Sequence, residues 1–123
     1  MSLDSRRLLP GQGWQAFNRR LRRKPWLNLD MVVGLLRLEL SIADAFTLKD
    51  KRRVVKSLKD RIAHRFNVSV SEVDALDRIR TAVIGVAMVS NDHGYVEGGL
   101  SKVVDLVRAE PRATLEDYEI ELL

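Results

Sequence analysis

Five basic residues between positions 47 and 66 have the type and spacing to bind phosphate groups. They belong to the run TLKDKRRVVKSLKDRIAHRF, and they are Lys49, Arg52, Arg53, Lys56 and Lys59. Adjacent cations on one helix face suit a phosphate backbone because they form charge-assisted hydrogen bonds and release bound counterions. An ordinary solvated helix face is the alternative interpretation. The sequence therefore gives RNA binding by these residues as a hypothesis.

The helix that would carry these cations is predicted from an apolar stripe with steps of three and four residues. Thr47 and Asp50 match a capping box, with Asp in place of the usual Glu, and fix its start. Eight Lys or Arg against two Asp give the stretch a net charge of +6. Lys51 falls on the apolar side, where we expect it to reach around the first turn or to hold a buried carbonyl. The stripe is Leu48, Val55, Leu58, Ile62 and Phe66.

Composition indicates one globular domain in a chain of 123 residues with 46% apolar and 31% charged residues. Cysteine is absent, which excludes thiolate chemistry and fits a reducing cytoplasm. No apolar run approaches the ~18 residues of a membrane span. The net charge of +4 is uneven, because residues 1–30 carry seven cations and two acids and residues 31–123 carry fourteen and fifteen. The net charge of the whole chain is therefore no evidence that residues 31–123 bind nucleic acid.

Residues 1–30 differ from the rest and are predicted to form a basic N-terminal extension. Trp14, Phe17 and Leu21 lie among arginines there, a pattern that suits RNA or an anionic membrane surface. The alternatives are a loosely ordered tail, or a translation start placed upstream of Met31.

The remaining pattern predicts a β-α-β-β-α-β domain over residues 31–123. Strict alternation marks a strand over 32–42, and Val68, Val70 and Val73 with intervening serines mark a weaker one. Residues 81–89 are apolar on both faces, as in a central strand. A helix capped near Asp92 and a strand ending near Leu122 follow. This order favours a ferredoxin-like α+β sandwich, a four-stranded antiparallel sheet with two helices on one face and the first and third strands central.

The uncovered face of this sheet offers small apolar residues and no aromatic on its two central strands, so we do not expect bases to stack there. An uncovered apolar patch usually marks an interface. We therefore predict a homodimer that uses Val33, Leu35, Val83, Gly85, Ala87 and Val89.

The residues give little support to catalysis. Asp92 is interpreted as a helix cap, and two histidines, His64 and His93, lack metal-binding spacing. Asp117, Glu119 and Glu121 share a strand face and are interpreted as a solvated edge. We expect no enzyme activity, no metal and no cofactor.

Several motifs resemble the YlxP-like family of small bacterial proteins of unassigned function. They are MVVGLLRLEL, the run Thr47 to Arg53, RFNVSVSEVD, GVAMVSND and DYEIELL, within residues 31–123. The resemblance implies a ferredoxin-like fold and, because family genes often lie among translation genes, a role linked to the ribosome. The family usually begins near Met31, and many members carry a tryptophan that the loop 74–80 (DALDRIR) lacks.

The sequence thus predicts a cytoplasmic, non-catalytic accessory protein, with no membrane contact, that binds ribosomal RNA or a ribosome-bound protein through the basic helix. The alternative is a homodimeric module that binds a protein or small ligand on the open sheet face.

Overall fold

The computed structural model describes residues 31–123 and confirms the predicted β-α-β-β-α-β order of a ferredoxin-like α+β fold. The predictions for the extension 1–30 lie outside the described residues. The elements are β1 (Val32–Ser41), α2 (Leu48–Arg65), β2 (Ser69–Asp74), β3 (Thr81–Ser90), α3 (His93–Arg108) and β4 (Thr114–Leu122).

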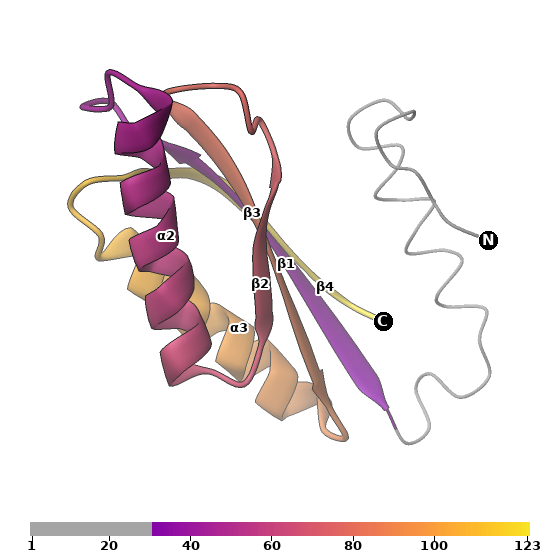
Figure 1. Cartoon of the computed structure of the whole chain (residues 1–123). Coiled ribbons are helices and arrows are strands. Elements are labelled where there is room, and N and C mark those ends of the chain that lie inside the picture. The colour runs from indigo at the N-terminus through magenta and orange to yellow at the C-terminus, as the bar shows by residue number, and fades with distance from the viewer. Residues whose placement is uncertain (1–30) are drawn as a thin grey trace.

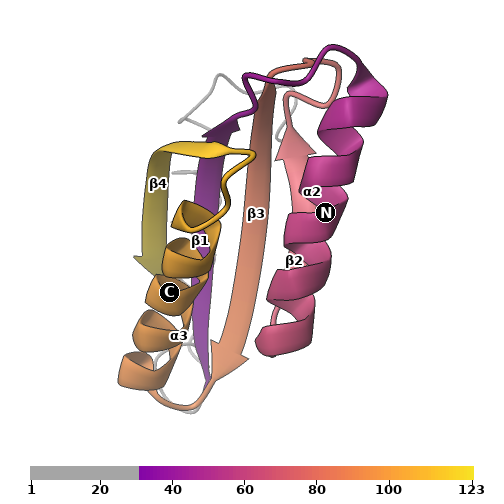
Figure 2. The ribbon, with the colours of Figure 1, turned by 90° about the vertical axis from the view of Figure 1, so that its left-hand side faces the viewer.

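The four strands form one antiparallel sheet in the order β2-β3-β1-β4. The strands β1 and β3 are central, as the sequence predicts. Both helices lie on one face of the sheet (Figure 1). In Figure 2, α3 stands over β1 and β4, and α2 stands on the side of β2. The helices leave the other face of the sheet free of secondary structure within residues 31–123.

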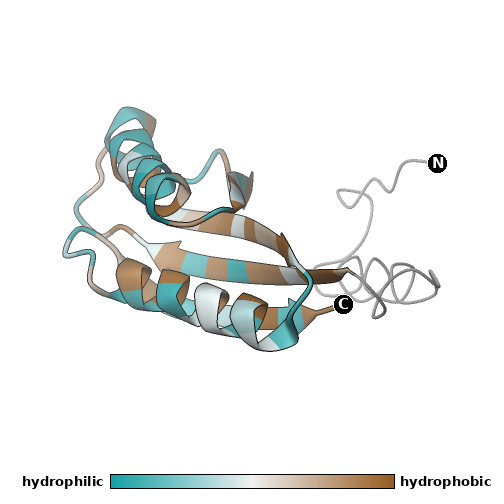
Figure 3. Ribbon diagram, turned by 90° about the horizontal axis from the view of Figure 1, so that it is seen from below, coloured by the Kyte–Doolittle hydropathy of each residue, from teal (hydrophilic) through white to brown (hydrophobic). Residues whose placement is uncertain are grey.

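The core forms where the alternating residues of β1 meet the apolar stripes of the two helices. Buried and half-buried residues alternate without exception along β1. Its inward residues Leu36, Leu38 and Leu40 are at most 1% exposed, as are Leu58 of α2 and Val103 of α3. Figure 3 shows the apolar segments of the helices turned toward the sheet. This burial of aliphatic side chains is the main source of the domain's stability.

Two glycines let α3 pack closely against the sheet. A Cβ at Gly34 would lie 2.8 Å from Leu100 Cδ1, and one at Gly99 would lie 2.6 Å from Met88 Cε. A Cβ at Gly98, in contrast, would meet no atom of another element within 4 Å. The close approach therefore requires one residue of the Gly98-Gly99 pair, and the other only weakens the helix.

The strand β2 contains a β-bulge at Val73, near the end of the strand. The register with β3 shifts between Glu72 and Asp74. Val73 lies against Gly85 on the open face, and it is 55% exposed. Regular alternation along β2 already places Val73 on the face opposite to Val70, so Val73 adds apolar surface to the open face of the sheet.

Candidate nucleic-acid interface

The start of α2 is fixed by the predicted capping box. Thr47 Oγ1 accepts a hydrogen bond from the Asp50 N–H at 3.1 Å. Asp50 Oδ2 accepts one from the Thr47 N–H at 3.1 Å and another from the Phe46 N–H at 3.0 Å. These bonds, the one from Phe46 above all, lower the pKa of Asp50 below its ordinary value. The charged carboxylate therefore acts as part of the helix cap.

The orientation of α2 separates its apolar and basic residues as the sequence predicts. Its buried residues are Lys51, Val54, Val55, Leu58 and Ile62. Four of the five predicted phosphate-binding cations are exposed, and Lys59 is half-buried. We call Lys49, Arg52, Arg53, Lys56 and Lys59 the cationic face.

The cationic face is only partly neutralised by carboxylates. Lys56 Nζ lies 2.7 Å from Asp60 Oδ2, with both side chains more than 60% exposed. Such an exposed pair contributes little to stability and leaves the lysine accessible. The other carboxylate of α2 is that of Asp50, which caps the helix and lies near enough to Arg53 to interact electrostatically. The face therefore retains an excess of positive charge at its surface.

A second basic cluster joins the middle of α2 to the loop after α3, and local sequence patterns did not predict it. The Glu110 side chain is buried and pairs with Arg61 and with Arg112, whose Nη2 lies 2.8 Å away. Arg112 also donates to Ser57 Oγ at 3.0 Å. The hydrogen bonds from Arg112, together with both guanidinium charges, lower the pKa of Glu110 to about 2. Because these residues are distant in sequence, only the fold reveals their pairing.

Lys51 has a structural role. Its Nζ donates to the carbonyls of Ala75, Leu76 and Thr81 at 2.8, 3.3 and 3.2 Å, which uses all three donors of the ammonium group. Glu72 Oε2 lies 2.9 Å away and balances the charge. Ala75 has a φ of 57°, a conformation unfavourable for a residue other than glycine. Lys51 thus holds the loop between β2 and β3, and of its two expected roles it has the one in which it binds buried carbonyls.

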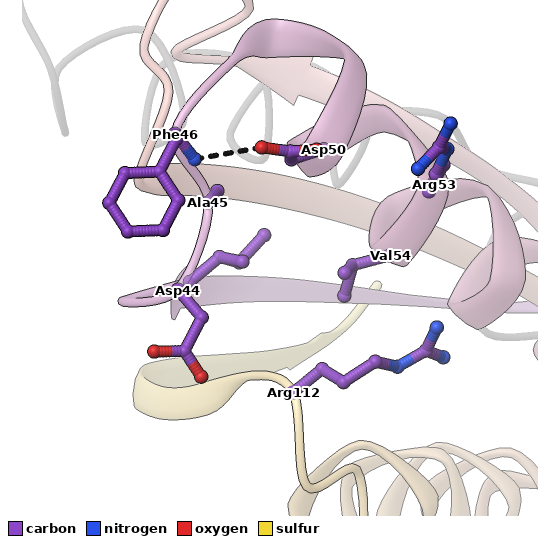
Figure 4. Close-up of a pocket in the computed structure, with 8 residues that line it drawn as sticks. Asp44, Ala45, Phe46, Asp50, Arg53, Val54 and Arg112 are labelled. Carbon is purple, nitrogen blue, oxygen red and sulfur yellow. Dashed lines mark hydrogen bonds between the residues drawn. The ribbon is translucent and has the colours of Figure 1, made fainter.

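An open hollow of about 400 Å³ lies beside the start of α2. Figure 4 shows Phe46 and Asp44 on one side of the hollow and Arg53 and Arg112 on the other. Phe46 is 73% exposed. This aromatic residue was not predicted to belong to the site, although the sequence shows it directly before the cap of a basic helix.

Five of the six predicted interface residues are accessible on the open sheet face, and the sixth, Val83, is buried. Val33, Leu35, Gly85 and Ala87 are half-buried, and Val89 is 57% exposed. Val83 is only 4% exposed, so it is already covered within the chain and offers little surface to a partner. The face lacks an aromatic residue on β1 and β3 in the described structure.

The other acidic residue considered for catalysis, Asp92, has a structural role. Asp92 caps α3 by accepting a hydrogen bond from the Tyr95 N–H at 3.2 Å, as predicted. Within residues 31–123, no group of three or more His, Cys, Asp or Glu side chains could hold a metal ion. Neither described helix is long and apolar enough to cross a membrane.

These features define a small ferredoxin-like α+β domain with a cationic helix on its covered face. The chain belongs to the DUF503 family of proteins of unknown function, whose sequence profile matches residues 33–120. It is similar to the uncharacterized protein YlxP of Bacillus subtilis, with 34% identity over 80 residues, 65% of this chain and 87% of that protein.

Solved structures with related folds have low sequence identity to this chain. The de novo designed protein Foldit4 is 14% identical, with a TM-score of 0.48 over 76% of this chain and 96% of its own. A C-terminal segment of the aIF2 alpha subunit from Pyrococcus abyssi is 12% identical, with a TM-score of 0.45 over 94% of this chain and 61% of its own. Similarities at this level carry no functional argument.

Proposed function

We propose that this protein is a non-catalytic, RNA-binding accessory protein that contacts phosphates with the cationic face of α2. The observation that carries the proposal is the row Lys49, Arg52, Lys56 and Lys59, in which steps of three and four residues place the cations along one side of a helix. The row extends over about 15 Å at 1.5 Å per residue. A row of accessible cations binds a phosphate backbone without reading its sequence.

The target we propose is ribosomal RNA or a ribosome-bound protein in the cytoplasm. This choice is supported by the resemblance to the YlxP-like proteins described above, and the lack of cysteine is compatible with a reducing compartment. The cationic face itself supports RNA over a protein partner, because it lacks the aromatic and apolar residues that enrich the centres of protein interfaces.

Two double variants of the full chain separate local charge from net charge. Arg52→Glu with Lys56→Glu reverses two cations of the cationic face. Lys102→Glu with Arg108→Glu reverses two exposed cations of α3. Each pair of reversals changes the formal charge by −4, so that both variants go from +4 to zero. Affinity for a labelled RNA is measured between low and moderate salt, and thermal unfolding checks that each variant is folded.

The proposal predicts that the α2 variant loses most of its affinity, while the α3 variant stays close to the wild type. Single-stranded binding has a salt slope of ~0.7 per phosphate contact, so loss of two contacts lowers the slope by ~1.4. Equal losses in the two variants would show that net charge alone governs binding and would contradict the proposal.

A second function is favoured by the open sheet face, where Val73 and Val89 are each more than half exposed. Contiguous apolar surface of this kind suits a second copy of the chain. In this alternative, Ala87→Arg dissociates a homodimer, as sedimentation shows, and charge reversal on α2 has no effect on function.

A further inference from the structure

The most exposed large apolar side chain in the described structure lies at the N-terminal end of the cationic face. Phe46 is 73% exposed, whereas Phe66 is half-buried and packs against the core. The backbone around Phe46 is nevertheless fixed. Ala45 is buried and donates to the Ile42 carbonyl at 3.2 Å, and the Phe46 N–H donates to Asp50. An exposed ring on a fixed backbone is already arranged to receive a partner at little entropic cost.

A guanidinium group supports one side of this ring. The Cζ atom of Arg80 lies 5.6 Å from the centroid of the Phe46 ring, within the range of a cation–π contact. The Arg80 carbonyl accepts a hydrogen bond from the Ile42 N–H at 2.9 Å, which ties the start of β3 to the segment that carries Phe46. The aromatic ring and the planar cation thus come from two connections held together at one end of the molecule.

We propose that Phe46 and Arg80 form a stacking platform for one unpaired base of an RNA strand whose phosphates lie along the cationic face. This inference rests on the proposed function and specifies its ligand as single-stranded RNA. Bases that leave a duplex stack on aromatic rings and guanidinium planes, whereas paired bases are inaccessible to them.

The charges around the ring agree with a base at this position and phosphates beside it. Phe46 immediately precedes the cap of α2, so a strand that follows the helix reaches the ring next to Lys49 and Arg53. The carboxylate of Asp44 shares the side of the hollow on which Phe46 lies, and it repels a phosphate there (Figure 4). A base carries no charge, and its amino groups can donate to a carboxylate.

The test compares three variants of the full chain in binding to a labelled oligoadenylate of about ten nucleotides and to a blunt RNA duplex. Phe46→Ala removes the ring. Phe46→Trp keeps a larger one and adds a fluorophore that a stacked base quenches. Tyr95→Ala is the matched control, because Tyr95 is 63% exposed at the start of α3, at the opposite end of the molecule from the start of α2 (Figure 2).

We expect Phe46→Ala to weaken oligoadenylate binding by about tenfold, the lower part of the range for one stacked base, with an unchanged salt slope. The affinity of Phe46→Ala for the duplex stays the same. Phe46→Trp retains its affinity for oligoadenylate, and its tryptophan fluorescence is quenched by RNA more than that of the wild type. Tyr95→Ala binds both RNAs as the wild type does. The stacking proposal would be overturned if Phe46→Ala bound oligoadenylate as tightly as the wild type does, or if it lost as much affinity for the duplex as for oligoadenylate. Neither result would contradict phosphate binding by the cationic face. Failure of the wild type to bind either RNA would overturn both proposals.

Discussion

Replacing Lys51 by methionine removes a buried ammonium group while keeping most of the volume of the side chain. The carbonyls of Ala75, Leu76 and Thr81 lose their donor, and the carboxylate of Glu72, whose side chain is 11% exposed, loses its counter-charge. Removing one member of a buried ion pair costs about 3–5 kcal/mol. Because Leu76 in the loop is exposed, water can reach part of the freed backbone, and we expect the lower value, about 3 kcal/mol.

The free energy of unfolding is measured for the full chain by urea denaturation at pH 7. Glu72→Gln is the comparison, because it also removes one charge of the pair but leaves all three hydrogen bonds of Lys51, and we expect a smaller loss than for Lys51→Met. A loss below 1 kcal/mol for Lys51→Met would refute this structural role. Unchanged stability together with lost RNA affinity would instead assign the lysine to ligand binding.

Three further predictions concern stability and assembly. Gly98→Ala should raise the free energy of unfolding by about 1 kcal/mol, because nothing lies within 4 Å of the added Cβ, whereas Gly34→Ala should lower it by 1–3 kcal/mol through overpacking, as urea melts will show. Glu110 has a pKa of about 2 in the folded chain against an ordinary 4.5, so its stabilisation is complete above pH 5 and lost as the pH falls toward 2. Glu110→Gln should therefore cost about 1–2 kcal/mol at pH 7, after allowance for the half-exposed arginines, and flatten the acid side of the stability profile; an unchanged profile would contradict this. If the open sheet face is an interface between two copies, Ala87→Arg should produce monomers in sedimentation experiments, and a wild type that is itself monomeric would exclude that interface.

Local patterns were sufficient to predict the fold because each element has a strong signal in sequence. The alternation along β1 and the apolar stripe of α2 follow directly from strand and helix periodicity. The predicted helix 47–66 agrees with Leu48–Arg65 because the capping residue Thr47 is visible in sequence. The β-bulge at Val73 was not predicted, because a bulge depends on pairing with β3, which local patterns do not reveal.

Only the part of the candidate site that lies within the single helix α2 could be predicted from the sequence. The cationic face follows from helical spacing alone, and so does the inward direction of Lys51. The cluster around Glu110 joins α2 to the loop after α3, and the contact between Phe46 and Arg80 joins two separate connections. Their partners become neighbours through sheet topology and loop geometry, which a pattern of residue types does not specify.

Phosphate binding by the cationic face of α2 can be tested with one salt titration of RNA binding. The full-length wild type is compared with Arg52→Glu/Lys56→Glu and with Lys102→Glu/Arg108→Glu at equal net charge. We predict steeply salt-dependent binding in the wild type and the α3 variant, and weak binding with a slope lower by ~1.4 in the α2 variant. An α2 variant that binds as the wild type does would contradict the account and place the phosphate contacts elsewhere in the chain.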